Sequence, residues 1–436
     1  MKKFFPFSGL RYNPESIDCL ADVISQPYDK ITAEEREILW RRHKKNVVRL
    51  ILPPPDGDDP DFVTGESTES SDWYEKAATR LQSWIREGVL ISDSPRFYVY
   101  RHHFFYRNQS YTRTGMYGSL SLTEEDAPLA HEFTFEGPKA DRFRLINATQ
   151  ANLSPIFLLS DGDMNTWDGI FSTTGETLAQ FEDLDGQNHE ILSITDAGAI
   201  QAIQDFVQNR TLVIADGHHR YETAQNYMRK MMKETGRDPE SEPWGRVMAF
   251  IVPAESPDLL VLPTHRVISQ MPSGWMNDLL SKAEPYCAIE PLTDYNGDTL
   301  RQLLSKPEQS QSIAVMAKNQ AFLLTLQEGE LPNSLLALAP PLRRLNVSIL
   351  HQFLLESCLN LTPADLQGIT RYIRSEEESL DHVQSGAAQA AFLLGGLLPK
   401  TVLEVSQHRV RMPHKSTDFY PKIPTGLIFR SVAPSK

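Results

Sequence analysis

The sequence has 436 residues, of which 40% are hydrophobic and 23% are charged, and its formal net charge is −14. This length exceeds what one ordinary hydrophobic core serves, so we expect two to three domains. The negative charge argues against non-specific binding of nucleic acids, because such binding needs a basic surface that displaces counterions from phosphates. Any anion site must therefore be a local basic pocket.

The cysteines and the N-terminal residues indicate a cytoplasmic protein. Cys19, Cys287 and Cys358 are odd in number and widely spaced, so neither a disulfide framework nor a zinc motif is expected. The first residues, MKKFFPFSGLRYNPES, lack the continuous apolar segment of a signal peptide. Apolar runs elsewhere are too short for a membrane span, so we expect no membrane partner.

We divide the chain into three consecutive regions, 1–125, 126–270 and 271–436. In the first region, the motif QPYDK gives Asp29 either a role in a turn or a role in a site. Residues 53–71 are rich in proline, acidic residues and serine, which predicts an acidic, mobile surface loop. The patterns around this loop predict helices and strands, in chain order a helix over 33–45, a strand over 47–52, a helix over 73–87, and paired strands over 96–105 and 114–122.

The central region opens with the stretch HEFTFEGPKADRFR, residues 131–144. Its Gly137-Pro138 pair predicts a turn with Pro138 at the first position of a helix. Lys139 then lies at the start of that helix, where it either binds an anion or is neutralised by nearby acidic residues. Glu132 follows His131, and a glutamate beside a histidine can serve as a general base, although adjacent residues of a strand face opposite sides.

The most informative stretch is TLVIADGHHRYETAQNYMRK, residues 211–230. An apolar strand ends at a turn formed by Asp216 and Gly217, one of which would be the N-cap of the following helix. That helix opens with His218, His219 and Arg220. Cations at this positive end are unfavourable by roughly 0.3–1 kcal/mol per charge unless an anion is bound there. The pattern thus favours a phosphate site, and the alternative is a helix cap with one histidine packed inside and Arg220 paired to a nearby carboxylate.

Two further stretches bring basic residues to places where ligands bind. The run LLVLPTHR delivers His265 and Arg266 to the end of an apolar segment, where α/β sheets present ligand groups. Near the C-terminus, MPHKSTDFYPK forms a loop stiffened by prolines that could hold an anion, or whose lysines are merely solvated. It is no Walker A motif, because both glycines are missing. The other elements expected in this region are a helix over 347–358, a strand over 390–394 and a helix over 400–408.

Together, QPYDK, HEFTFEGPKADR, ADGHHRYETA, LPTHRVI and MPHKSTDFYPK resemble the DUF1015 family, in the right order and over nearly the whole chain. DGHHR also resembles the signature of the ParB/sulfiredoxin-like superfamily, some members of which are free-serine kinases that use a nucleotide or pyrophosphate. The chain departs from the family pattern at Gln26, where proline is frequent, and at Phe133 and Phe135, which replace an expected arginine and leucine.

The resemblance implies a mixed α+β fold whose central mixed sheet has a ParB/sulfiredoxin-like core with additional α/β subdomains. It implies a small-molecule phosphotransferase that phosphorylates a free serine-like hydroxyl from pyrophosphate, ATP or ADP, with Mg²⁺ bridging the phosphoryl oxygens. The catalytic candidates are Asp216, Glu132, His218 and His219, with Asp216 and Glu132 as alternatives for the base. The phosphate-binding candidates are Arg220, Gly217, Lys139, Arg142, His265, Arg266, Lys415, Ser416, Thr417 and Lys422.

Two other functions remain open, and each makes a different demand on the residues. One is a nucleotide-sensing or nucleic-acid-associated binding module of the ParB kind. The other is a metal-dependent hydrolase built on Asp216, His218 and His219, in which adjacent histidines of one helix turn would point about 100° apart. For the phosphotransferase we expect that Lys139, Arg220, Arg266 and Lys415 converge on one cavity, because cations at element ends need a common anion.

Overall fold

The computed structural model describes residues 3–55, 73–123, 125, 127–132, 136–413 and 415–435. They form two compact units, each described here by itself. Unit 1 comprises Met1–Leu129, Thr134–Leu259 and Pro421–Lys436, and unit 2 comprises Ala130–Phe133 and Leu260–Tyr420. The C-terminal strand belongs to unit 1, and the three consecutive regions expected from the sequence stay a prediction. Most of the loop expected over 53–71, together with Phe133 and Phe135, lies outside the described residues.

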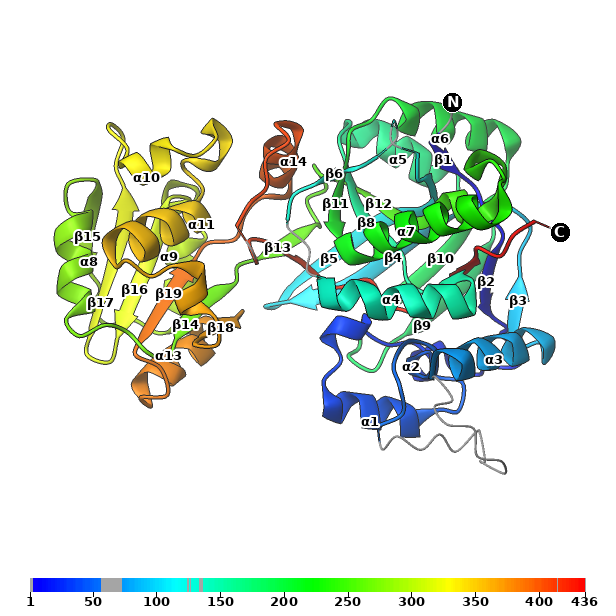
Figure 1. Ribbon diagram of the computed structural model, residues 1–436, viewed down its shortest axis with the longest axis horizontal. Helices are drawn as coiled ribbons and strands as arrows, with labels where there is room; N and C mark the ends of the chain where they lie inside the picture. Colours follow the sequence, from blue (N-terminus) through cyan, green and yellow to red (C-terminus); the bar gives the residue numbers. More distant parts are fainter. Residues whose placement is uncertain are drawn as a thin grey trace. The chain divides into compact units, whose positions relative to one another are not determined.

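Unit 1 contains the larger of the two main sheets, together with the helices that lie around it (Figure 1). Its strands are β1 (Phe4–Phe5), β2 (Gly9–Tyr12), β3 (Leu90–Ser92), β4 (Phe97–Tyr106), β5 (Gln109–Ser121), β7 (Ala151–Asn152), β8 (Ile156–Ser160), β9 (Thr177–Glu182), β10 (Asn188–Ile194), β11 (Leu212–Asp216), β12 (Arg246–Pro253) and β21 (Phe429–Ser431). Its α-helices are α1 (Ala33–Arg42), α2 (Val48–Ile51), α3 (Trp73–Arg86), α4 (Glu136–Thr149), α5 (Met164–Ser172), α6 (Ala197–Gln208) and α7 (His218–Thr235). Short 3₁₀ helices cover Leu20–Asp22, Tyr28–Lys30, Pro239–Ser241 and Pro243–Gly245.

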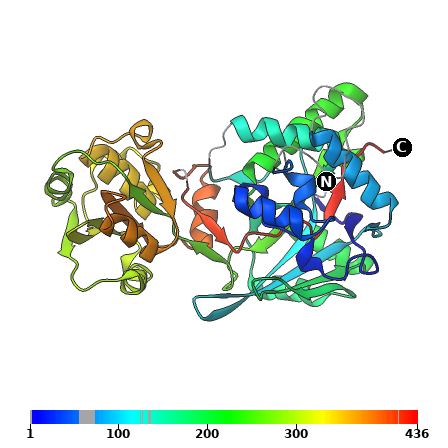
Figure 2. The ribbon, with the colours of Figure 1, turned by 90° about the horizontal axis from the view of Figure 1, so that it is seen from below.

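The central sheet of unit 1 is mixed, as expected. Its strand order is β6-β11-β8-β12-β5-β4-β10-β9, where β6 is the short strand Leu129–Ala130, and β1 pairs with β5. β12 and β8 run parallel, whereas β11 with β8, β12 with β5, and β4 with β5 are antiparallel. The β4–β5 hairpin is the long cyan ribbon of Figure 2. A second sheet, β3-β2-β21-β7, ties the C-terminal strand to the N-terminal part of the chain.

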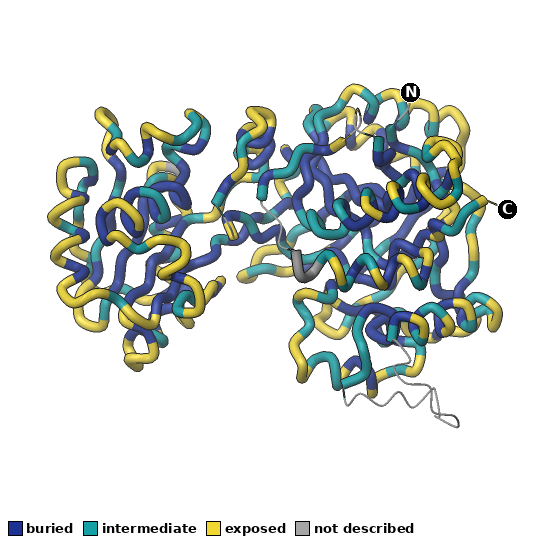
Figure 3. Tube along the Cα trace, in the orientation of Figure 1, coloured by how far each residue is buried: buried dark blue, intermediate teal, exposed yellow. Residues whose placement is uncertain are grey.

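The two faces of the central sheet differ in chemistry. One face packs its apolar side chains against α5, α6 and α7, with Trp167, Ile203 and Tyr227 among the buried residues of this core. The opposite face carries buried polar and aromatic groups on β4 and β5, including Tyr100, His102, Arg113 and Tyr117. The strands β8, β11 and β12 are buried along nearly their whole length, and the middle of the sheet is accordingly dark blue in Figure 3. A strand covered on both sides must place every side chain in the interior, so the polar groups of the second face need internal partners.

Unit 2 is built on an antiparallel sheet of order β15-β17-β16-β19-β14-β18. The strands of unit 2 are β13 (Leu260–Leu262), β14 (His265–Ile268), β15 (Cys287–Pro291), β16 (Ser312–Ala317), β17 (Gln320–Leu326), β18 (Thr370–Ile373), β19 (Ala390–Leu394) and β20 (Asp418–Tyr420). Of these, β13 and β20 pair with each other outside the main sheet. Its α-helices are α8 (Trp275–Ala283), α9 (Gly297–Leu304), α10 (Asn333–Leu336), α11 (Asn346–Ser348), α12 (Pro363–Leu366), α13 (Glu376–Gln384) and α14 (Pro399–Gln407), with a π-helix over Ile349–Cys358 and 3₁₀ helices over Pro307–Gln309 and Pro340–Leu342.

Both faces of this sheet are covered. α8 and the π-helix pack on one face, and α9 and α13 pack on the other. The helix expected over 347–358 is therefore present with a π-helical turn, and the strand expected over 390–394 is β19. None of the helices among the described residues of either unit is both long and apolar enough to cross a membrane.

Two details of the expected elements were wrong. The strand predicted over 47–52 is the short helix α2. A short apolar run fits a strand or a buried helix equally well, and here the side-chain oxygen of Asn46 accepts a hydrogen bond from Val48 N at 2.9 Å, which starts the helical turn. The second detail is the helix predicted to begin at Pro138, because α4 already begins at Glu136.

Candidate anion-binding site

The site begins where β11 ends and α7 starts, as the sequence predicts. Asp216 is the last residue of β11, and Gly217 is the N-cap of α7 with φ of 89°. This left-handed backbone conformation favours glycine. A side chain at this position would also bring its Cβ within 2.9 Å of Arg220 Nε. The backbone conformation is therefore what favours glycine here, and Arg220 folds back across the start of its own helix.

Asp216 holds two cations at this junction. Lys422 Nζ donates to Asp216 Oδ1 at 2.9 Å, and an Arg220 guanidinium nitrogen donates to Asp216 Oδ2. Burial alone raises the pKa of Asp216, but the charges of Lys422 and Arg220 outweigh it and hold the pKa well below its usual value. The carboxylate is therefore ionised at neutral pH. The paired carboxylate considered as the alternative partner of Arg220 is thus present, and it is Asp216 itself.

A second arginine lies close to the first. Arg142 of α4 donates to the carbonyl of Ile51 at 3.0 Å and to Asp141 at 2.7 Å, and its side chain is only 8% exposed. Its guanidinium also lies over the ring of Tyr28, 4.0 Å from the ring centre. Burial raises the pKa of Tyr28, and the charges of Arg142 and Arg220 offset only part of that rise. Tyr28 is therefore a neutral hydroxyl between two guanidinium groups.

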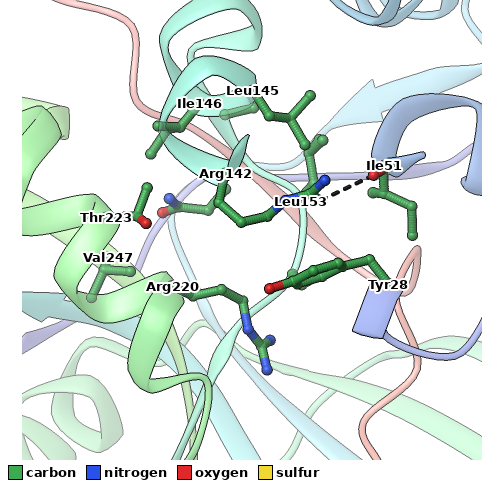
Figure 4. A pocket seen from close by; sticks show the side chains of 12 residues that line it. Tyr28, Ile51, Arg142, Leu145, Ile146, Leu153, Arg220, Thr223 and Val247 are labelled. Atoms are coloured by element: carbon green, nitrogen blue, oxygen red, sulfur yellow. Dashed lines mark hydrogen bonds between the residues drawn. The ribbon is translucent and has the colours of Figure 1, made fainter. Parts of the chain in front are cut away.

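These groups line an open pocket of unit 1. Figure 4 shows Tyr28, Arg142, Arg220 and Thr223 around it, with apolar side chains such as Leu145 completing the wall. The pocket is small and open to solvent, with a volume of about 60 Å³. The Thr223 hydroxyl is buried and has no hydrogen-bond partner among the described residues. A ligand here would meet two guanidiniums and a free hydroxyl against an apolar wall.

The other predicted residues of unit 1 are divided between the junction and α4. His218 and His219 occupy the first turn of α7 and are partly buried. Lys139 of α4 lies at 2.6 Å from Glu222 of α7. This carboxylate replaces the neighbouring acidic residues that the sequence suggested as partners, because α4 packs against α7. Lys139 is thus neutralised across a helix interface.

In unit 2, Glu132 and Thr417 come together. Thr417 Oγ1 contacts His131 Nε2 at 2.8 Å and donates to Glu132 Oε1 at 3.4 Å. His131 is completely buried, whereas the Glu132 side chain is 18% exposed. The hydroxyl of Ser416 turns inward instead and donates to the carbonyl of Pro413. The sequence signals HE and KST, nearly 300 residues apart, therefore form one cluster.

Arg266 and Lys415 are also neighbours, but through the backbone. Arg266 is 1% exposed and donates to Lys415 O at 3.1 Å, to His351 Nε2 at 3.1 Å and to the carbonyl of Thr264. Burial lowers the pKa of Arg266 to about 10. Lys415 has a left-handed φ of 58°. Arg266 thus braces the loop that carries Lys415.

His265 has a different environment from Arg266, because neighbours in a strand face opposite sides. It is completely buried, accepts a hydrogen bond from Leu394 N at 3.2 Å, and lies 3.7 Å from Glu376. His265 and Arg266 belong to the strand β14 itself, where the sequence placed them at the end of a strand. This burial favours a structural role for His265. The expected convergence of Lys139, Arg220, Arg266 and Lys415 stays a prediction, since two of them belong to each unit.

The metal-hydrolase alternative receives no support from the described side chains. Among them, the histidine and acidic groups whose ligand atoms lie within 4.8 Å of one another are His102, Asp183 and His189. Asp216, His218 and His219 do not form such a group.

Several lining residues escaped the sequence reasoning. Tyr28 lay in the motif QPYDK, but only Asp29 was considered for a role. Thr223 lies one helical turn after Arg220, so the 3.6-residue period of α7 could have identified it. Asn152 and Ser154 line the same pocket from the chain after α4. Their polar side chains are separated in sequence from DGHHR, and spacing alone carries no signal for them.

No protein with a curated description matches this chain. Similar solved structures include free serine kinase in complex with AMP, at 11% identity and a TM-score of 0.34, covering 70% of this chain and 86% of that one. A conserved hypothetical protein from Pyrococcus furiosus has 11% identity and a TM-score of 0.33, with 73% and 95% covered. SbnI with a C-terminal truncation, from Staphylococcus aureus, has 12% identity and a TM-score of 0.33, with 70% and 84% covered.

The family model described as "Protein of unknown function (DUF1015)" matches residues 4–348, which is most of the chain and includes β11, α7 and the pocket around Arg220. The chain therefore belongs to the DUF1015 family.

Proposed function

We propose that the pocket around Arg220 binds the phosphoryl groups of a small-molecule phosphate donor, and that the protein is a phosphotransferase. The observation that carries this proposal is the pair of largely buried guanidiniums, Arg142 and Arg220, in one open pocket of a chain with net charge −14. A guanidinium binds phosphate with two parallel hydrogen bonds and keeps its charge at any physiological pH.

Each residue of the junction has a task in this proposal. Arg220 has five N–H donors, and its bonds to Asp216 and to the carbonyl of Pro155 leave others for a phosphate. Gly217 provides no capping side chain, so the first N–H groups of α7 can donate to the same anion. His218 and His219 lie in this first turn, and Lys422 adds charge next to Asp216.

Asp216 is a poor choice for the general base. A carboxylate whose pKa is held far below its usual value accepts a proton weakly, and a general base works best with a pKa near the operating pH. We assign Asp216 the task of orienting Arg220 and Lys422. Glu132, the other carboxylate considered for the base, stays a prediction. The acceptor that we propose, from the resemblance of DGHHR, is a free serine-like hydroxyl.

The residues of the junction do not fit a tightly held Mg²⁺. Mg²⁺ in phosphoryl-transfer sites is held by one or two carboxylates together with substrate phosphates. Here both oxygens of Asp216 are bonded to cations, which repel a further cation. We therefore derive no step through Mg²⁺, and the arginines and Lys422 provide the charge that neutralises the phosphoryl group.

The proposal is tested by a transfer assay with free serine as the acceptor. Pyrophosphate, ATP and ADP are each incubated with serine and protein, and phosphoserine is detected by ³¹P NMR. Wild-type protein should form phosphoserine with at least one donor, and Arg220→Ala should be at least about tenfold slower, because it loses a charge-assisted contact. Arg229→Ala is the matched control, since Arg229 is exposed on the same helix and, among the described residues, donates a hydrogen bond only to Asn226. Phosphoserine formed equally well by Arg220→Ala would contradict the assignment.

A further inference from the structure

The polar face of the central sheet contains a buried cation that the proposed site does not use directly. Arg113 of β5 is 0% exposed. One of its terminal nitrogens donates to the carbonyl of Pro421, and the other lies 3.3 Å from His102 Nδ1. Arg113 makes no ion pair with a carboxylate among the described residues. Keeping a charge in the interior without such a partner is costly, so its two hydrogen-bonding contacts call for an explanation.

A line of hydrogen bonds continues behind Arg113. His102 Nε2 lies 2.6 Å from Gln187 Oε1, and the backbone N–H of Gln187 donates to Asp183 Oδ1 at 2.9 Å. Burial, together with the charge of Arg113, lowers the pKa of His102 well below its usual value, so the ring is neutral. Its Nε2–H then donates to Gln187, and its Nδ1 accepts from Arg113. The orientation of the guanidinium is therefore set from the β9–β10 hairpin.

The same cluster has the donor set of a divalent metal site, formed by His102, Asp183 and His189. Each ring nitrogen, however, already has a partner, since His189 contacts Tyr100 Oη at 2.7 Å and Asp183 at 3.0 Å. A metal on His102 Nε2 would move the ring proton to Nδ1, where it would face the donor of Arg113. These contacts favour a hydrogen-bonded network over a metal site.

The far end of the network reaches the junction through one peptide bond. The carbonyl oxygen of Pro421 and the Cα of Lys422 belong to the same planar peptide unit. A donor that fixes this oxygen also fixes the direction in which Lys422 leaves the backbone. Lys422 Nζ in turn donates to Asp216 at 2.9 Å, and Asp216 holds Arg220.

We propose that Arg113 is a positioning residue for the anion site, because it holds the Pro421 carbonyl and thereby directs Lys422 onto Asp216. This inference rests on the proposed function for its consequence in binding. Its geometric part is independent of any ligand, so the two can fail separately.

The geometric part is tested on Asp216 itself, by ¹³C NMR of aspartate carboxyls with the signal assigned through Asp216→Asn. In the wild type, the pKa of Asp216 should lie well below that of an ordinary aspartate, because Lys422 and Arg220 stabilise its charge. Lys422→Met should raise its pKa, and Arg113→Met should raise it by a similar amount. The double variant should show no further rise, since Arg113 acts through Lys422. Arg113→Lys, which keeps a donor for Pro421, should lie between Arg113→Met and the wild type.

Arg430→Met is the matched control. Arg430 is also buried and donates to backbone carbonyls, those of Arg246 and Pro243, but not to Pro421. Arg430→Met should lower the free energy of unfolding without changing the pKa of Asp216. If Arg113→Met unfolds, Arg113→Lys decides, because its Asp216 pKa should still lie above the wild-type value, and an Asp216 pKa in that variant equal to the wild-type value would overturn the inference. Additive shifts of the Asp216 pKa in the double variant would also overturn the inference. So would Zn²⁺ binding by the wild type that is lost in His102→Ala.

The binding part is measured by calorimetry with pyrophosphate. Arg113→Met and Lys422→Met should each weaken binding about tenfold, and the double variant should be no weaker than Lys422→Met. A wild type that binds no pyrophosphate, together with a raised Asp216 pKa in Arg113→Met, would refute the proposed function and keep the positioning role. Full affinity in Arg113→Met with an unmoved Asp216 would refute the positioning role alone.

Discussion

Arg220 in unit 1 and Arg266 in unit 2 come from the same sequence pattern, an apolar run followed by histidine and arginine, but they have different surroundings. Arg220 lines an open pocket, is 15% exposed and bonds a carboxylate that also holds Lys422. Arg266 is 1% exposed, and its hydrogen bonds to Thr264, His351 and Lys415 hold other parts of the protein in place. The pattern thus identifies arginines at element ends, and only burial and partners separate a ligand group from an internal brace.

The largest effect that tests this comparison is expected at Arg266. Arg266→Met removes a buried group and leaves the carbonyls of Thr264 and Lys415 without a donor, so the free energy of unfolding should fall by about 2–4 kcal/mol. Urea unfolding measures the loss. Pyrophosphate affinity should remain unchanged at temperatures where the variant is folded. A stable variant with weakened binding would show that Arg266 is a ligand group after all.

A pH series on Asp216 gives a smaller effect. Its folded pKa lies below the unfolded value, so its ion pairs contribute stability above the unfolded pKa, about 3.9, and this stability is lost as the pH falls below that value. Wild type should therefore exceed Asp216→Asn by about 1–3 kcal/mol at pH 7 and equally at pH 5, with the gap closing only below about pH 4. Urea unfolding at these pH values provides the check. A gap that closes near pH 6 would mean that Asp216 is not held by Lys422 and Arg220.

The smallest effect is expected at Lys139. Its ammonium is held by Glu222, and the two side chains are 18% and 33% exposed. Such a pair is worth about 0.5 kcal/mol, so Lys139→Met should change both the stability and the pyrophosphate affinity only slightly, roughly twofold in affinity. Calorimetry with pyrophosphate would show it. A loss of tenfold or more would extend the anion site onto α4 and restore Lys139 as a phosphate ligand.

The β11–α7 junction could be predicted from the sequence because its signals are local. The four apolar residues Leu212 to Ala215 are followed by the turn at Asp216 and Gly217 and then by polar helix formers, so the boundary between strand and helix is clear. Residues 47–52 lacked such a boundary, and their helix depends on Asn46, whose side chain also bonds the carbonyl of Asp22. A contact of this kind is tertiary, so the apolar pattern could not reveal it.

The pocket was predictable only in part for the same reason. The charge pattern at the start of α7 indicates an anion, and it identifies Arg220 and Gly217. Tyr28 reaches the pocket from a 3₁₀ helix near the N-terminus, and Lys422 reaches Asp216 from the last part of the chain. Which distant groups meet at the junction depends on the order of strands in the sheet. A single sequence does not contain that order.

The central claim is that Arg220 binds phosphate, and calorimetry with pyrophosphate tests it directly when run beside urea unfolding of the ligand-free protein. Arg220→Ala loses a charge-assisted bond worth about 1.5–3 kcal/mol, so affinity should fall by roughly 10- to 150-fold, while Arg229→Ala should bind like the wild type. Arg220→Lys should not restore binding, because lysine lacks the bidentate geometry. Unchanged affinity in a folded Arg220→Ala protein would contradict the account, and so would a loss of stability with no loss of binding.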